Sequence, residues 1–298
     1  MSTTTRTPES QQDQARPPRP YRVGQSRPLA RFGLYTAVIL LALLYIYPFL
    51  IELGTAFKTD PDASNHPLNP IPTTWTTNAF HQLAQQDFSR WFANSAIVAI
   101  SVTIGRVFFD SLAGYALARL RFFGRSALFA AIVAVMAVPS VVLLIPKFLV
   151  LNQIGIYNTY TGMIVPLITD AAGVFIMRQF FESVPVSIEE AAHIDGAGTF
   201  RTFWSVVLPM ARPALITLTI LSFQGSWNEL GHFVVSRSSP SLNTLTTGVA
   251  TLVSGGLGKT NQYPLKLAAA LLMTIPVALL FFVFQRYIMR SSEGAVKE

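Results

Sequence analysis

The 298-residue sequence contains no cysteine. This absence excludes disulfide scaffolds, cysteine-ligated zinc, iron–sulfur clusters and thiol nucleophiles. Charged residues are also scarce: they make up 12% of the chain, whereas a soluble domain carries about 25%. Hydrophobic residues make up 51%, and the formal net charge is +7. So much apolar sequence with so few charges argues against a soluble enzyme and against a disordered chain, and it indicates an integral membrane protein.

Six long apolar runs predict six transmembrane helices, because a helix needs about 20 mostly apolar residues to cross a bilayer. Each run is continuously apolar, whereas the strands of a membrane barrel alternate. The predicted fold class is therefore all-α, a polytopic membrane protein. The first run is too long for the core of a signal peptide, so we expect it to be retained. The spans are expected at residues 33–57, 91–118, 128–146, 160–177, 206–235 and 264–285.

Lysine and arginine are distributed unevenly around these spans. Fifteen of the 22 lie in the two tails or in the loops after the second and before the fifth span, six lie on the opposite side, and Arg106 lies within the second span. Because cytoplasmic loops carry the excess of positive charge, we expect both termini in the cytoplasm. Residues 1–32 are expected to be a disordered basic tail, residues 58–90 an outer loop, and residues 287–298 a cytoplasmic C-terminal tail. The basic residues thus indicate membrane topology rather than nucleic-acid binding.

The cytoplasmic segment 185–209 carries signals of ordered structure. Ser187 and Glu190 have the spacing of a capping box, which predicts a short helix from Ile188. Gly196 suits a helix end that needs a positive φ. Thr199 is expected to cap a second helix. A helix of about eight residues is not stable alone in water, so this segment is expected to pack against its own spans and to be seated in a partner.

The second predicted helix shows the spacing of one buried apolar stripe, followed by a break before the fifth span. The stripe consists of Phe200, Phe203, Trp204 and Val207, and the break is at Leu208–Pro209.

The same segment resembles the EAA loop of permease subunits of binding-protein-dependent ABC importers. The matching positions are Glu190, Ala191, Ala192, Asp195, Gly196, Ala197, Phe203, Leu208, Pro209 and Pro213. Similarity to the carbohydrate-uptake class of this family extends to other segments, among them Ala113–Ala116, Arg119, Trp227–Glu229 and the tail at 284–297.

This resemblance implies a type I ABC importer permease fold in residues 91–286, in the inner membrane of a bacterial cell. It also implies a second permease subunit, two ATP-binding subunits, an extracytoplasmic solute-binding protein and a sugar-like solute. The EAA helix would dock into the ATP-hydrolysing subunit, with Glu190 and Asp195 supplying charge or capping and Gly196 the bend. ATP and Mg would be bound by those partner subunits, and this chain would bind no cofactor.

Polar groups within the spans are candidates for the solute pathway, because such groups usually face protein or water. The fifth span carries an indole ring beside amides and a carboxylate, which suits a polyhydroxylated solute, although hydrogen bonding between helices is an equally good reading. These candidates are Gln224, Trp227, Asn228, Glu229 and, in the fourth span, Asp170. Arg106 and Asp110, four residues apart, are expected to form a pair that braces the bundle.

Other functional classes find little support. Gly255–Thr260 is similar to a phosphate loop, but that pattern needs glycine where Val253 stands. The four histidines are scattered, without the spacing of a metal site. A secondary transporter would show inverted repeats and ion ligands, and a membrane-embedded enzyme would need a clustered acid and base. The alternatives that remain are a secondary, ion-coupled transporter and an ABC importer for a non-sugar solute, such as a glycerol-phosphate compound.

Overall fold

The computed structural model describes residues 28–254 and 262–294 of the chain. Every regular element within these ranges is helical, which confirms the predicted all-α fold class. Most of the expected basic tail, the segment similar to a phosphate loop and the last residues of the chain lie outside the described residues. Residues 28–32, expected in the tail, are helical, because Pro28 occupies the first helical position, where its missing N–H is not needed.

The chain divides into two units, residues 1–48 and 49–298. In the first unit, α1 (Pro28–Ala56, which continues into the second unit) is apolar along most of its length. Within Phe32–Ala56, a window of 18 residues has a mean hydropathy of 2.3. That length and composition suit a span in contact with lipid or with another subunit.

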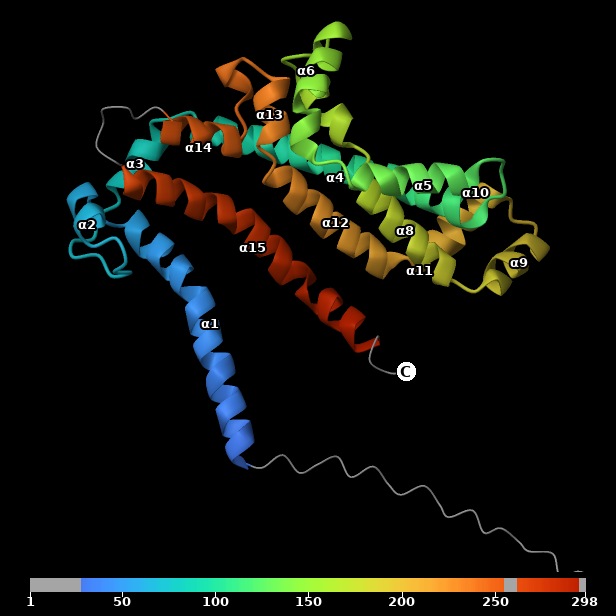
Figure 1. Cartoon of the computed structure of the whole chain (residues 1–298), viewed down its shortest axis with the longest axis horizontal. Helices are drawn as coiled ribbons and strands as arrows, with labels where there is room; N and C mark the ends of the chain where they lie inside the picture. The colour runs from blue at the N-terminus through green and yellow to red at the C-terminus, as the bar shows by residue number, and fades with distance from the viewer. Residues whose placement is uncertain (1–27, 255–261, 295–298) are drawn as a thin grey trace, which may run out of the picture. The chain divides into compact units, whose positions relative to one another are not determined.

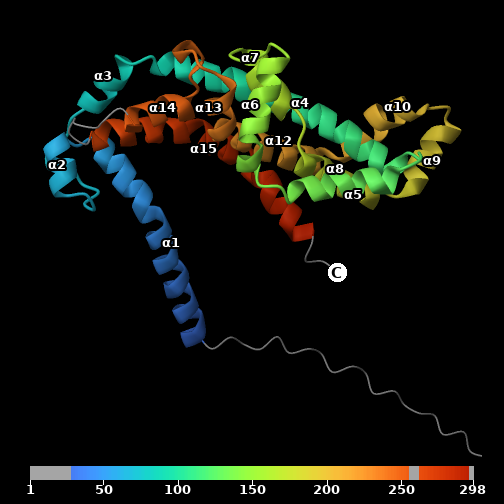
Figure 2. The same ribbon diagram turned by 45° about the horizontal axis from the view of Figure 1, so that its top comes forward.

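The second unit is built on three helices: α4 (Phe88–Arg119), α8 (Ala171–Ser183) and α12 (Arg212–Trp227). They pack against one another (Figures 1 and 2) around a core that includes Tyr115, Met177, Phe181, Phe203, Val207 and Leu218. The smaller helices that precede α8 are α2 (Asp60–Asn65), α3 (Asn78–Ala84), α5 (Arg125–Met136), η1 (Ser140–Leu143), α6 (Leu144–Gln153), α7 (Tyr160–Ile164) and η2 (Val165–Leu167).

After α8 the chain forms two short helical segments and then returns through α12. These and the remaining elements are α9 (Val186–Ile194), α10 (Thr199–Thr202), η3 (Phe203–Val207), α11 (Leu208–Met210), α13 (Gly231–Ser236), η4 (Pro240–Leu242), α14 (Leu245–Ser254) and α15 (Tyr263–Gly294). In Figures 1 and 2, α9 and α10 lie at the end of the second unit opposite to α2 and α3.

Among the described residues, four helices are long and apolar enough to cross a membrane. Two further spans result if each of two bent helix pairs is counted as one span. The third predicted span is not a straight helix: α5 and the helix that follows it meet at 99°. Pro139 stands at this bend, at the N-cap of η1, and disfavours helical geometry for the residue before it. The span expected at 128–146 is therefore a bent pair of helices and not one straight helix.

The fifth span is also shorter than predicted. Helix α12 begins at Arg212, after a bend of 80° at Ala211, and ends at Trp227, not at residue 235. Pro209 and Pro213 flank the bend, and each removes a backbone donor from the helix. In the fourth span, Tyr160–Ser183, regular helix is interrupted between η2 and Asp170, which caps α8.

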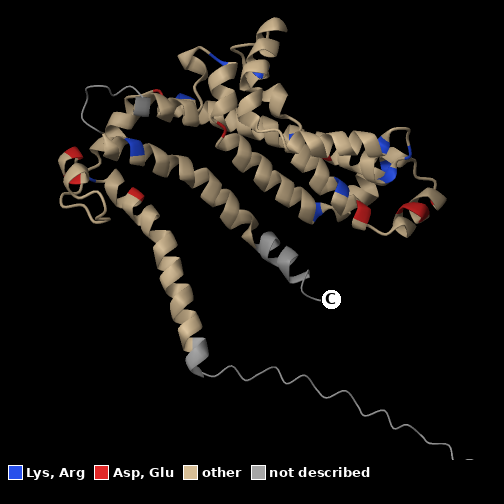
Figure 3. Cartoon of the chain, viewed as in Figure 1, with Lys and Arg blue, Asp and Glu red and all other residues tan. Residues whose placement is uncertain are grey.

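Most lysines and arginines lie toward the ends of the long helices, whose middle stretches carry few charges (Figure 3). Arginines are frequent at the end of α4, at the start of α5 and at the start of α12. This is the same end of the second unit that carries α9.

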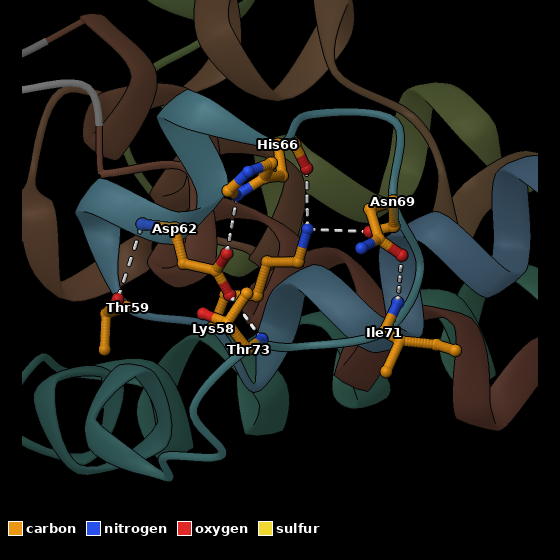
Figure 4. A network of polar contacts seen from close by, with 7 residues as sticks. All are labelled: Lys58, Thr59, Asp62, His66, Asn69, Ile71 and Thr73. Carbon is orange, nitrogen blue, oxygen red and sulfur yellow. Dashed lines mark hydrogen bonds and ion pairs between the residues drawn. The ribbon is translucent and has the colours of Figure 1, made fainter.

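A network of polar contacts orders the loop around α2 (Figure 4). Lys58 is 1% exposed, and its Nζ donates to the backbone oxygens of His66 (2.7 Å) and Asn69 (2.6 Å). Asp62 accepts from the backbone N–H of Thr73 (2.9 Å) and contacts His66 Nδ1 (3.1 Å). The loop is thus a fixed structure, because the buried ammonium and the carboxylate each hold backbone from a different turn.

We expect this loop to loosen in acid. The backbone N–H of Thr73, and then the His66 side chain, lower the pKa of Asp62 below its usual value. Because the folded pKa is lowered, the contribution to stability is complete above the unfolded pKa of about 3.9 and is lost as the pH falls through the folded value. Hydrogen exchange at residues 67–76, corrected for intrinsic rates, should accelerate in that range. In the Asp62→Asn variant, the amides of residues 67–76 should exchange fast already at neutral pH, and the amides of α3 serve as the internal reference.

Candidate functional site

Helix α9 forms from the segment that resembles the EAA loop. It begins at Val186 after Pro185 at the N-cap, two residues before the predicted start, and no side chain caps it. The predicted capping box is wrong, because Ser187 lies inside the first turn and is not placed before it. Pro185, whose φ is already fixed near the helical value, sets the start of the helix instead.

Two adjacent carboxylates of α9 have opposite environments. Glu190 is exposed, as a group that binds a partner should be, whereas Glu189 is 8% exposed. The Oε1 of Glu189 lies 2.9 Å from Arg119 Nε, an ion pair without hydrogen-bond alignment. The hydroxyl of Tyr115 donates to Glu189 Oε2 at 3.2 Å. Successive residues on a helix point about 100° apart, so one carboxylate can be tied to α4 while its neighbour faces outward.

Arg119 also joins α9 to the end of α8. Its Nη2 donates to the backbone oxygens of Phe181 (2.6 Å) and Val184. Glu189, Tyr115 and Arg119, which we call the α9 anchor, therefore connect the protruding helix to two spans. Sequence analysis missed Glu189. The signal that could have found it was the pair Tyr115 and Arg119. These residues lie one helical turn apart at the predicted cytoplasmic end of the second span, on the same side of the membrane as the loop.

Gly196 ends α9 as predicted. Its φ is +79°, its N–H donates to His193 O (3.0 Å), and the N–H of Ala197 donates to Ala192 O (2.9 Å). These are the two hydrogen bonds of a Schellman motif, in which the residue after the C-cap is left-handed. The chain turns sharply here because glycine adopts this conformation without strain.

Gly196→Ala should therefore destabilise the loop more than Gly198→Ala does. Both glycines have open space around an added Cβ, but Gly198 has a φ of −74°. Only the left-handed position has a conformational cost, about 1–2 kcal/mol. Hydrogen exchange of residues 186–202 in the two variants measures the difference, and equal protection would contradict this role of Gly196.

The second short helix differs from its prediction. Gly198, not Thr199, is at the N-cap of α10. The expected buried stripe divides: Phe203 and Val207 are buried in the core, whereas Phe200 (69% exposed) and Trp204 (50% exposed) stack on each other outside it. The reason is a π-helical turn at η3, which changes the periodicity on which the stripe was based.

The exposed surface of α9 therefore includes several of the predicted coupling residues. Ala192 is buried, Ala197 is half-buried, and Phe203 belongs to the core. Besides Val186 and Ser187 in its first turn, α9 and its C-terminal turn expose Glu190, Ala191, His193, Ile194 (87% exposed), Asp195 and Gly196. An exposed isoleucine among small and charged residues on so short a helix suits a surface covered by a partner.

Two of the predicted pathway residues, Asp170 and Glu229, lie on the wall of one cavity of about 780 Å³. Gln224 and Asn228 are exposed but do not line it. Trp227 is 2% exposed, and its Nε1 donates to Met273 O at 3.0 Å. Its ring offers no open face to a solute in this conformation and instead braces α12 against α15.

Arg106 and Asp110 do not form the expected pair, because each contacts the broken backbone of the fourth span. Arg106 Nε donates to Leu167 O (2.7 Å), and Asp110 Oδ1 accepts from the N–H of Asp170 (3.1 Å). The two side chains thus hydrogen-bond to backbone groups that a continuous helix would satisfy internally.

Comparisons with known proteins agree with these features. A family model described as "Binding-protein-dependent transport system inner membrane component" matches residues 110–293. The inner membrane ABC transporter permease protein YcjP of Escherichia coli is 30% identical, over 91% of this chain and 98% of that protein. The diacetylchitobiose uptake system permease protein NgcG of Streptomyces coelicolor is 32% identical, over 88% of each chain.

A solved structure shares the fold. The crystal structure of a bacterial ABC transporter involved in the import of the acidic polysaccharide alginate contains a chain that matches with a TM-score of 0.77 and 25% identity. The match covers 88% of this chain and 98% of that one.

Proposed function

Because the chain belongs to the family of binding-protein-dependent transport system inner membrane components, we propose that it moves a sugar-like solute into the cytoplasm and receives energy through α9. It is a permease subunit of an ABC importer, a multi-pass component of the inner membrane and not an enzyme. The observation that carries the proposal is a short helix that is exposed on one face and tied to two spans on the other.

The exposed face of α9 is proposed to seat in an ATP-binding subunit. Glu190, Ala191 and Asp195 supply charge and a close approach on that face, and Gly196 gives the turn that makes the loop compact. The buried Ala192 and Phe203 and the half-buried Ala197 and Leu208 support it from the inside, and Pro209, which is exposed, lies at the break before the fifth span. The importer would comprise this chain, a second permease subunit, two ATP-binding subunits that hold ATP and Mg, and an external binding protein.

Coupling would proceed through the α9 anchor. When ATP binding draws the two ATP-binding subunits together, α9 moves with its subunit, and Glu189 and Arg119 pass the motion to α4 and α8. The cavity then opens outward, and hydrolysis returns it to the inward state. The arginine-rich helix ends lie beside α9, which would make this the cytoplasmic side. With six spans and the basic tails, both termini would lie on that side as well.

The proposal of a sugar-like solute is supported by relatives. The arabinooligosaccharides permease AraQ of Halalkalibacterium halodurans is 30% identical over 92% of this chain, and NgcG is named for diacetylchitobiose. An sn-glycerol-3-phosphate permease, UgpE of Yersinia enterocolitica, is 28% identical over 86%. The polar groups of the cavity, including Asp170 and Glu229, offer hydrogen bonds to solute hydroxyls.

Purification of the tagged chain in mild detergent tests the proposed function. ATP-binding subunits and a second permease should co-purify, and the reconstituted complex should import solute only with ATP. Glu190→Lys should lower the yield of the ATP-binding subunits. Asp87→Lys, which reverses an exposed carboxylate just before α4, is the matched control. Uptake that ignores ATP and follows the membrane potential would instead indicate a secondary transporter.

A further inference from the structure

The cavity of about 780 Å³ collects charged side chains from four separate segments of the chain. Its volume lies within the range of small-molecule sites, about 300–1,000 Å³. Three helix breaks contribute to its wall: the bend after α5, the break before α8 and the end of α12. Its charged residues are Arg106, Asp110, Lys147, Asp170 and Glu229.

The three carboxylates already have backbone partners. Asp110 accepts from the N–H of Asp170 (3.1 Å), Asp170 from that of Gly173 (3.3 Å), and Glu229 from that of His232 (2.7 Å). Each therefore has a structural role at a helix start or break, where a carboxylate satisfies free backbone donors. Asp110 is also fully buried, so it cannot reach a solute.

A hydrogen bond from a backbone N–H does not neutralise a carboxylate, but none of the three carboxylates pairs directly with either cation. Within the described chain, no carboxylate oxygen lies within 4 Å of Arg106 or Lys147. Arg106 donates from Nε to Leu167 O, so its other guanidinium N–H groups remain for a ligand. Lys147 is half-buried and has no polar contact within the described residues. A cation within a membrane protein is costly unless it has a counter-charge, and it commonly marks a ligand or ion pathway.

Helix α8 begins at the same cavity, with Ala171 and Ala172 on the wall. The positive end of its dipole is already capped by the Asp170 carboxylate, which accepts from the N–H of Gly173, so the helix start adds no free positive potential. The positive charge that faces the cavity comes from Arg106 and Lys147.

We infer that this cavity binds the anionic group, phosphate or carboxylate, of a polyhydroxylated solute, with Lys147 and Arg106 as its counter-charges. Glu229 and Asp170 have oxygens left to accept hydroxyl groups of the same solute. This inference rests on the proposed function, which it refines from a sugar-like solute to an acidic one.

The test measures solute binding to the purified complex without its binding protein, so that only the membrane subunits determine which solute binds. Glucose, glucuronate and glucose 6-phosphate are the probes, compared by equilibrium dialysis at low salt. The two anions should bind about tenfold more tightly than glucose, a difference of about 1.4 kcal/mol, because hydrogen bonds to a charged group are stronger than those to a neutral one. High salt should reduce the difference.

Substitutions assign the preference to this chain. Lys147→Gln should bring the anions to the affinity of glucose, and Lys147→Arg should restore the preference. Lys266→Gln, at a half-buried lysine outside the cavity, should change nothing. Equal binding of the three probes, or a preference that survives Lys147→Gln, would overturn the inference. ATP-dependent import by the same complex would leave the proposed function intact.

Discussion

Glu189→Ala is expected to uncouple ATP hydrolysis from import while the ATP-binding subunits stay attached. The substitution removes the ion pair with Arg119 and the acceptor of the Tyr115 hydroxyl. Removing one partner of a buried ion pair costs about 3–5 kcal/mol, and the 11% exposure of both side chains places this pair at the lower end. Helix α9 would keep its outer face but lose its fixed link to α4.

The neighbouring carboxylate provides the control for this prediction. Glu190→Ala changes the exposed face and leaves the α9 anchor intact, so it should weaken attachment of the ATP-binding subunit. The number of solute molecules imported per ATP, and the yield of ATP-binding subunits, should be measured for both variants. Glu189→Ala should lower the number of solute molecules imported per ATP, and Glu190→Ala should lower the yield of ATP-binding subunits. If both variants lower the yield equally, Glu189 has no separate role in coupling.

Glu189→Gln distinguishes a positioning role from a general loss of structure. The amide keeps the acceptor for Tyr115 but has no charge for Arg119. Import per ATP should recover in part, with the thermal unfolding midpoint close to that of the unmodified chain. Tyr115→Phe removes one hydroxyl and should have a smaller effect, about 1 kcal/mol or less, as for a single neutral hydrogen bond.

The second large effect is expected at the crossing of α4 and α8. An added Cβ at Gly114 would lie 2.7 Å from Met177 Cβ and 2.9 Å from the backbone N of Arg178. Backbone cannot rotate away as a side-chain end can, so Gly114→Ala must separate the two helices. Overpacking of this kind costs about 1–3 kcal/mol, and the separation would also displace Arg119 from the carbonyls at the end of α8.

Gly225→Ala is the matched helical control, because its Cβ would meet only Arg106 Nη1, at 3.8 Å. This change should be neutral or slightly stabilising, since alanine favours a helix over glycine. The thermal unfolding midpoint of the detergent-purified chain measures both variants. The prediction fails if Gly114→Ala unfolds at the same temperature as Gly225→Ala.

The sequence predicts most of the long helices well, because their apolar runs exceed what any other element needs. Helix α4 begins three residues before its predicted start and ends one residue after its predicted end. The bend in the third span was missed because hydropathy counts residues and does not register Pro139 as a change of direction. The break expected at Leu208–Pro209 lies close to the observed bend at Ala211, although the fifth span was expected to begin before it. The small residues after Asp170 indicated a locally open stretch, and the helix is interrupted just before them.

Local signals in the loop gave mixed results for physical reasons. Gly196 was predicted because positive φ has a strong residue preference. The capping box failed because Pro185 offers a competing helix start, and the aromatic stripe failed because of the π-turn. Periodicity alone could not show which of Glu189 and Glu190 is buried, since that depends on Arg119, seventy positions earlier. The sequence indicated Asp170 and Glu229 on the wall of the cavity but not Lys147, because the cavity forms where helix breaks that are distant in the sequence meet.

The most direct measurement of the central claim is the accessibility of α9 in the assembled importer. The chain has no cysteine, so Ile194→Cys introduces a single thiol on the exposed face of α9, and Ile71→Cys places one at the opposite end of the unit. Maleimide labelling rates should be compared in the isolated chain and in the ATP-binding complex. We predict that assembly protects position 194 strongly and position 71 not at all, and that a short bifunctional reagent joins position 194 to the ATP-binding subunit. Equal labelling of position 194 before and after assembly, without a cross-link, would contradict the account.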